Sequence, residues 1–328
     1  MRTRLRSLLL PALAGLALLA TPASAVTIDW VPIGNPGNTP DTLTNCHHTN
    51  CGSVAYNYSI DKYEVTNAQY AEMLNAKAAS DPLGLYSASM GTDATLGGIT
   101  RSGVSGSYTY AVKVGFADMP VTYVSFYDSL RFANWLNNGQ GAASTETGAY
   151  TLLGGRPTPS NGTTVTRNAG ANIVLTSENE WYKAAYYADP GVSAYYSNYP
   201  NGTGTFPGCV APGADTGNSA NCAGAVNALT NVGAYGLSVS PYGTYDQGGN
   251  VFEWNEENLG GSREYRGGSF ASTVDRLAAT SLLAGDPTFP SSSVGFRVAL
   301  VPEPGTGLLV MTGLAGLAAR QRRPKKSR

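Results

Sequence analysis

One stretch, residues 245–298, constrains this chain more than any other, because glycines and aromatic side chains recur together along it. Its three compact segments read DQGGNVFEW (246–254), RGGSF (266–270) and VGFRV (294–298). Glycine permits tight turns and close backbone approach, and an aromatic ring can fill the space beside it. The combination predicts irregular, tightly packed backbone.

Two carboxylates in the first segment suggest a binding site for a hard cation. Asp246 and Glu253 lie seven residues apart, with the turn Gly248-Gly249 between them. Carboxylate and carbonyl oxygens are the ligands that Ca²⁺ prefers, so a calcium site is one hypothesis. The alternative is that Glu253 pairs with a nearby arginine, such as Arg266 or Arg297, in a buried ionic cluster.

Six motifs in chain order resemble the formylglycine-generating enzymes, also called sulfatase-modifying factors. The three segments above are preceded by KYEVTN with Tyr70, MPV with Val124-Ser125, and LTSE with Glu180-Trp181. The resemblance runs from about residue 60 to residue 300. It implies an α+β, irregular and loop-rich fold with few helices and short strands, related to C-type lectins.

The resemblance also implies which atoms would hold calcium at the first segment. They are the carboxylates of Asp246 and Glu253 and the backbone carbonyls of Gly249 and Val251. Asp246 stands where the family usually has Asn, which retains an oxygen ligand and adds charge. Such a calcium ion would be structural.

The catalytic groups of the resembled family are missing. Its active members use two thiolates, copper and oxygen to oxidise a cysteine of a client sulfatase, and the resemblance places those thiols at Ser272 and Leu277. Neither side chain is a soft ligand for Cu(I), so we expect no copper and assign no catalytic residue. Ser272 as a hydrolytic nucleophile would need a base, and the chain's two histidines are His47 and His48.

Both ends of the chain carry export signals. Three arginines, an apolar run from Leu8 to Ala20 and the small residues Ala23-Ser24-Ala25 predict a signal peptide over residues 1–25; an N-terminal membrane anchor is the alternative. At the other end, Pro302-Glu303-Pro304 precedes an apolar segment, 308–319, and a basic tail. This arrangement resembles the PEP-CTERM sorting signal of exported bacterial proteins, which implies transient membrane anchoring and removal of residues 302–328 by a sorting protease.

Residues 26–301 remain as one domain, which is long enough for a substantial core. Without the two ends the domain retains 12 basic and 21 acidic residues, a net charge near −9. This charge argues against nucleic acid as a partner. The expected location is the cell envelope or the extracellular space.

The four cysteines fit an exported protein. Cys46–Cys51 and Cys209–Cys222 are the simplest disulfide pairing of the three that four cysteines allow. A zinc site formed by Cys46, His47, His48 and Cys51 is the alternative for the first pair.

Three capping boxes predict the starts of helices. They are Thr66 with Gln69, Ser125 with Asp128, and Ser177 with Glu180, and each precedes an apolar stripe. Strands are predicted over 26–32 and 54–60, loops with a hairpin over 81–118, and a long stapled loop over 193–237.

Two classes of function follow. The first is a binding or structural module of the cell envelope or its exopolysaccharide matrix, with polysaccharide or an envelope protein as partner. The second is a divergent formylglycine-generating oxidoreductase that acts on a client protein. Ser272 and Leu277, which stand at the expected thiol positions, favour the first class of function.

Six tyrosines suit either a sugar-binding surface or ordinary packing: Tyr56, Tyr58, Tyr186, Tyr187, Tyr195 and Tyr196.

Overall fold

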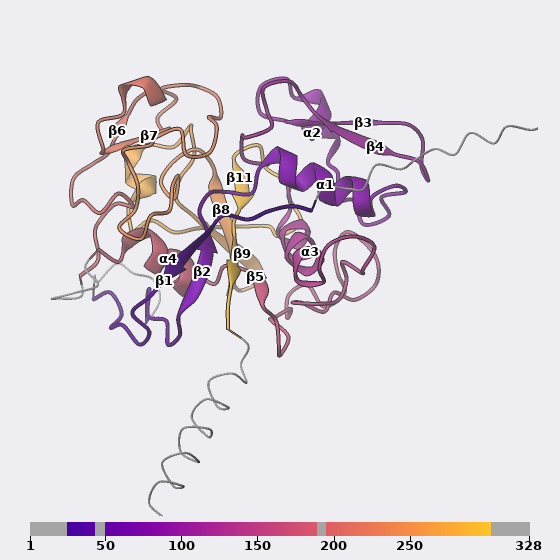
Figure 1. Cartoon of the computed structure of the whole chain (residues 1–328), viewed down its shortest axis with the longest axis horizontal. Coiled ribbons are helices and arrows are strands. Elements are labelled where there is room, and N and C mark those ends of the chain that lie inside the picture. Colours follow the sequence, from indigo (N-terminus) through magenta and orange to yellow (C-terminus); the bar gives the residue numbers. More distant parts are fainter. Residues whose placement is uncertain (1–24, 43–49, 189–194, 303–328) are drawn as a thin grey trace, which may run out of the picture.

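The computed structural model describes residues 25–42, 50–188 and 195–302. In these ranges short strands and a few helices are joined by long irregular segments (Figure 1). The helices are α1 (Asn67–Lys77), α2 (Ala88–Thr92), α3 (Phe126–Asn137) and α4 (Glu178–Tyr186), with 3₁₀ turns at Pro212–Ala214 and Val274–Leu277. The predicted α+β, loop-rich fold is confirmed.

The strands form two four-stranded sheets and two short pairs. One sheet has the order β1 (Trp30–Ile33), β2 (Tyr58–Asp61), β12 (Val298–Leu300), β5 (Ile173–Leu175). The other has the order β10 (Leu283–Gly285), β9 (Ser262–Arg266), β8 (Phe252–Leu259), β11 (Val294–Phe296). The pairs are β3 (Ile99–Ser102) with β4 (Thr109–Val112), and β6 (Gly208–Cys209) with β7 (Ser219–Ala220).

Local sequence explains where the three longer helices begin. Thr66, Ser125 and Ser177 each accept a hydrogen bond from the backbone N–H three residues later, and the side chain of that residue bonds back to the cap. All three predicted capping boxes are therefore present, and they satisfy donors that a helix start leaves free. The short helix α2 had no such box and was missed.

The end of the domain connects the two sheets. β11 pairs in parallel with β8, whereas β12, which begins two residues after β11 ends, pairs with β2 and β5 of the other sheet. Arg297 is the single residue between them. The chain thus passes from one sheet to the other at Arg297, beside the main apolar core.

The segments without regular structure are held by side chains and by a disulfide. Cys209 and Cys222 are bonded, as predicted, across the β6–β7 pair. The predicted partner of Cys51, Cys46, lies outside the described residues together with His47 and His48, so that pairing and its zinc alternative stay predictions.

The expected export segments also lie outside the described residues. These are the signal peptide, 1–25, of which only Ala25 is described, and nearly all of the sorting tail, 302–328. In the part of the chain that the structure describes, no helix has the length and apolar character needed to span a membrane.

Candidate functional site

The carboxylate of Glu253 lies in the core between an arginine and a tryptophan. Arg297 donates from Nε to Glu253 Oε2 (2.5 Å) and from Nη2 to Oε1 (2.7 Å). Trp181 Nε1 also donates to Oε2, at 2.7 Å. Both partners of this ion pair are fully buried. The three residues come from three of the six motifs, so the motifs meet here.

A second buried ion pair joins the RGGSF motif to the LTSE motif, which also contributes Trp181. Arg266 contacts both oxygens of Glu178, with Nε to Oε2 at 2.7 Å and Nη2 to Oε1 at 2.6 Å. Its Nε also lies 2.7 Å from Glu264 Oε1, and Nη1 donates to the carbonyls of Ala279 and Ser281. Arg266 therefore orders several loops around itself, which is a scaffold role.

The turn 246–250 depends on glycine and asparagine for its shape. Gly249 has φ +93°, and a Cβ there would lie 2.4 Å from the carbonyl oxygen of Asn221. Asn250 also has a positive φ, 58°, which Asn tolerates better than most residues. Its Oδ1 accepts from Thr230 N (3.0 Å), and its Nδ2 donates to Glu64 Oε1 (3.1 Å).

Asp246 makes its hydrogen bond to the backbone and not to a residue of the Glu253–Arg297 pair. Its Oδ2 accepts from the backbone N–H of Gly233, at 2.5 Å. It also lines a cavity of about 20 Å³ between the 200–248 loops and Leu277, which has room for about one water molecule. The carbonyls of Gly249 and Val251 follow in the same turn and lead into β8.

Three further carboxyl groups are buried near the Glu253–Arg297 ion pair. They belong to Asp61, Glu64 and Asp246. Burial raises the pKa of Asp61 to about 8 and that of Asp246 to about 6, although Arg297 opposes both shifts. Burial and the nearby Asp246 and Glu253 charges raise the pKa of Glu64.

Two oxygens of this acid cluster have no hydrogen-bond partner among the described residues. They are Asp61 Oδ2 and Glu64 Oε2. The sequence interpretation did not single out Asp61 or Glu64 as site residues. The only signal was the position of Glu64 inside the KYEVTN motif, and sequence alone does not show that a carboxyl is buried.

Calcium fits this region in part. Unpartnered carboxyl oxygens and an excess of acid favour a cation. Against it, both oxygens of Glu253 are already bound by Arg297. Across the described ranges no group of three or more His, Cys, Asp or Glu side chains is arranged to hold a metal ion. The ligand set of Asp246, Gly249, Val251 and Glu253 therefore stays a prediction.

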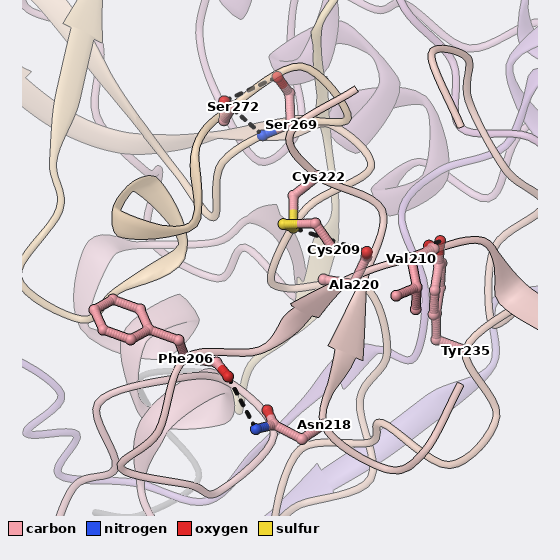
Figure 2. The surroundings of a disulfide bond; sticks show 9 residues. All are labelled: Phe206, Cys209, Val210, Asn218, Ala220, Cys222, Tyr235, Ser269 and Ser272. Carbon is pink, nitrogen blue, oxygen red and sulfur yellow. Dashed lines mark hydrogen bonds between the residues drawn. A yellow bond between two sulfur atoms is a disulfide. The ribbon is translucent and has the colours of Figure 1, made fainter. Parts of the chain in front are cut away.

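The two positions expected for catalytic thiols lie next to the disulfide. Leu277 is fully buried against Cys222, Ala220 and Tyr199. Ser272 Oγ bonds to the backbone N and the Oγ of Ser269, both at 3.0 Å (Figure 2). The carbonyl of Ser272 accepts from the N–H of Ala223, the residue after Cys222.

Cys209 and Cys222 lie well before the RGGS motif in the sequence, yet the fold packs Cys222 against Leu277. Distance along the chain therefore does not separate this cysteine from the expected thiol positions. The sulfurs of Cys209 and Cys222 are bonded to each other and the Ser272 hydroxyl is a hard donor, so this set does not fit Cu(I).

Most of the tyrosines considered for a sugar-binding surface serve packing. Tyr56 and Tyr58 donate to the side chain and the carbonyl of Glu180, and Tyr186 donates to the carbonyl of Leu277. Tyr187 and Tyr196 pack edge to face. Tyr195 is about half exposed, at 52 %. These contacts favour the packing interpretation for five of the six.

Residues 38–301 match the family described as the sulfatase-modifying factor enzyme 1-like domain. The chain belongs to this family. Residues 300–323 match the PEP-CTERM protein-sorting motif, which marks an exported protein handled by a sorting system. The search of curated proteins found no match.

Several solved structures resemble the fold. Treponema denticola variable protein 1 has a TM-score of 0.54 at 18 % identity, covering 86 % of this chain and 98 % of its own. CarF has a TM-score of 0.46 at 22 % identity, with coverages of 85 % and 100 %. PvdO from Pseudomonas aeruginosa has a TM-score of 0.43 at 17 % identity, with coverages of 84 % and 92 %. The first similarity supports the fold alone.

Proposed function

We propose that this chain is an exported binding or structural module of the cell envelope or its exopolysaccharide matrix, built on the family fold without the family's oxidative chemistry. One observation carries the proposal: Ser272 and Leu277 occupy the positions of the thiols, and Leu277 is buried in an apolar cluster. Truncating the Leu277 side chain would leave a cavity in this cluster, so this position has a packing role.

The motif residues support the same proposal. Glu253, Arg297, Glu178 and Arg266 are buried and bound to one another, and none of these charges is directed to solvent. A catalytic group needs access to its substrate. These four charges therefore act as scaffold.

The proposal includes the route to the envelope. The PEP-CTERM segment would hold the protein transiently in the membrane by residues 308–319, with the basic tail on the cytoplasmic side. A sorting protease would then remove the tail. The bound partner would be polysaccharide or an envelope protein.

The alternative is a divergent oxidoreductase, and the position of Cys222 beside Leu277 is the observation that favours it. The test incubates the purified protein with a sulfatase peptide, copper and oxygen, with and without a reductant that opens the Cys209–Cys222 bond. We expect no formylglycine by mass spectrometry in either condition. Conversion above the metal-free blank, lost in Cys222→Ser, would overturn the proposal and establish the oxidoreductase.

A further inference from the structure

A second and larger cavity lies away from the ion pair of Glu253 and Arg297 and from the thiol positions. It has a volume of about 320 Å³ and is lined by the start of α3, the 163–167 segment, the start of α4 and the end of β8. This volume is at the lower end of the range for small-molecule sites. Its chemistry is set by two consecutive glutamates, Glu256 and Glu257.

A bulge in β8 explains why both glutamates line one cavity. Side chains of consecutive residues in a regular strand point to opposite faces. Between Trp254 and Asn258 the register of β8 with β9 shifts, so the alternation is interrupted. Bulges commonly redirect a side chain at functional sites.

The carboxylate of Glu256 is held in place through one of its oxygens, and its other oxygen has no hydrogen bond from the described residues. Glu256 Oε1 accepts from the hydroxyl of Tyr150 and from Arg167 Nε, the latter at 2.7 Å. Its other oxygen, Oε2, accepts no hydrogen bond from the described residues, and the side chain is 19 % exposed. Glu256 thus presents an oriented, unused acceptor.

The second carboxylate is also unused. Glu257 is partly buried and lines the cavity, and its side chain makes neither a hydrogen bond nor a salt bridge with any described residue. Together the two glutamates offer three oxygens to a molecule in the cavity.

The positive charges around the cavity are already bound. Arg167 donates to Glu180, Glu256 and the carbonyl of Leu175. The terminal nitrogens of Arg263 donate to the backbone carbonyls of Gly162, Val165 and Glu256, and its guanidinium lies over the Phe126 ring. The cavity therefore presents acceptors, which disfavours phosphate or sulfate groups and favours a ligand that donates hydrogen bonds.

We propose that this cavity binds a polyhydroxylated ligand the size of one sugar ring, whose hydroxyl groups donate to Glu256 and Glu257. A dedicated metal site is disfavoured, because the described residues contain no cluster of three or more metal-binding side chains. The inference rests on the proposed function as an envelope binding module and names the class of ligand.

The test measures binding of neutral methyl glycosides of glucose, galactose, mannose and N-acetylglucosamine to the exported protein by saturation-transfer NMR titration. We expect at least one to bind in the millimolar range or tighter. Glu257→Gln removes an acceptor that has no internal partner, so the fold is retained while the dissociation constant rises about tenfold or more. Glu256→Gln should weaken binding similarly.

Glu72→Gln, in α1 and outside the cavity, is the matched control and should change nothing. If no glycoside binds, or if binding to Glu257→Gln equals wild type, the proposal is overturned. Calcium or magnesium alone binding to wild type but not to Glu257→Gln would show a cation site, which also overturns it. Binding of the protein to its own envelope fraction is measured separately, so that the proposed function can stand when this inference fails.

Discussion

The side chains of Glu253 and Arg297 form a two-point ion pair at the place where the chain passes from one sheet to the other. Glu253 in β8 lies opposite Gly295 in β11, and Arg297 follows β11 directly. The guanidinium also donates to the carbonyls of Asp61 in β2 and Tyr245. One arginine thereby connects strands of both sheets with the segment before the turn.

Glu253→Ala should strongly destabilise the domain. Removing one partner of a buried pair leaves an uncompensated charge, which typically costs about 3–5 kcal/mol. The free energy of unfolding from urea titration measures this. The double variant Glu253→Leu with Arg297→Met should recover part of the loss, because neither charge of the pair is then left without its partner.

The exposed neighbours Asp275 and Arg276 are the control for that prediction. Their charged atoms are 3.9 Å apart and both side chains are largely exposed. Asp275→Ala should change the free energy of unfolding by no more than about 0.5 kcal/mol. Equal losses for Glu253→Ala and Asp275→Ala would contradict the assignment of Glu253 to a buried pair.

Stability should fall as pH rises through the neutral range. Burial raises the pKa of Asp61 to about 8 in the folded protein, above its ordinary value of 3.8. Between about pH 4 and pH 8 the folded state therefore keeps a proton on Asp61 that the unfolded state has already lost. Its contribution to stability is full below that window and is lost as pH approaches 8, with a slope of about 1.4 kcal/mol per pH unit for one proton.

Asp61→Asn tests this expectation. The amide stays neutral, so the slope between pH 5 and pH 7, from urea titrations at each pH, should decrease by about 1.4 kcal/mol per unit. The exposed Asp118 is the control, and Asp118→Asn should leave the slope unchanged. An unaltered slope in Asp61→Asn would mean that Asp61 is ionised in the folded protein at neutral pH.

The sorting segment yields a separate prediction. Replacing Pro302-Glu303-Pro304 by alanines, or deleting residues 320–328, should leave the tail unprocessed or the protein released prematurely. Cell fractionation followed by intact-mass measurement distinguishes processed from unprocessed protein. Normal processing of both variants would show that the match to the sorting motif has no role in this chain.

Sequence predicted the features that depend on neighbouring residues. Ser177 with Glu180 begins α4 because a capping box is a local device. The pairing of Glu253 was left between calcium, Arg266 and Arg297, since its partner is 44 residues away and only the folded chain selects it. For the same reason the contact of Cys222 with Leu277 and the burial of Asp61 could not be predicted.

A calcium ion bound by Asp246, Gly249, Val251 and Glu253 would change the melting temperature in a way that the ion pair alone would not. Calcium bound only by the folded state would stabilise by about 2.7 kcal/mol at a hundredfold excess over Kd. The melting temperature should then rise with calcium and fall with chelator. Asp246→Ala would lose most of this response, because it removes a ligand oxygen from the set.

The ion pair without calcium predicts no calcium response in the wild type, and it predicts a gain in stability for Asp246→Asn. Asp246 is buried near Glu253, and its pKa is raised to about 6, so at pH 7.5 the folded protein contains an ionised carboxylate that burial and Glu253 disfavour. Asn removes that charge and retains an acceptor for the Gly233 N–H. The variant should then melt at or above the wild-type temperature, with or without chelator. Wild-type melting that ignores chelation, together with this gain in Asp246→Asn, would exclude calcium and leave Arg297 as the partner that neutralises Glu253.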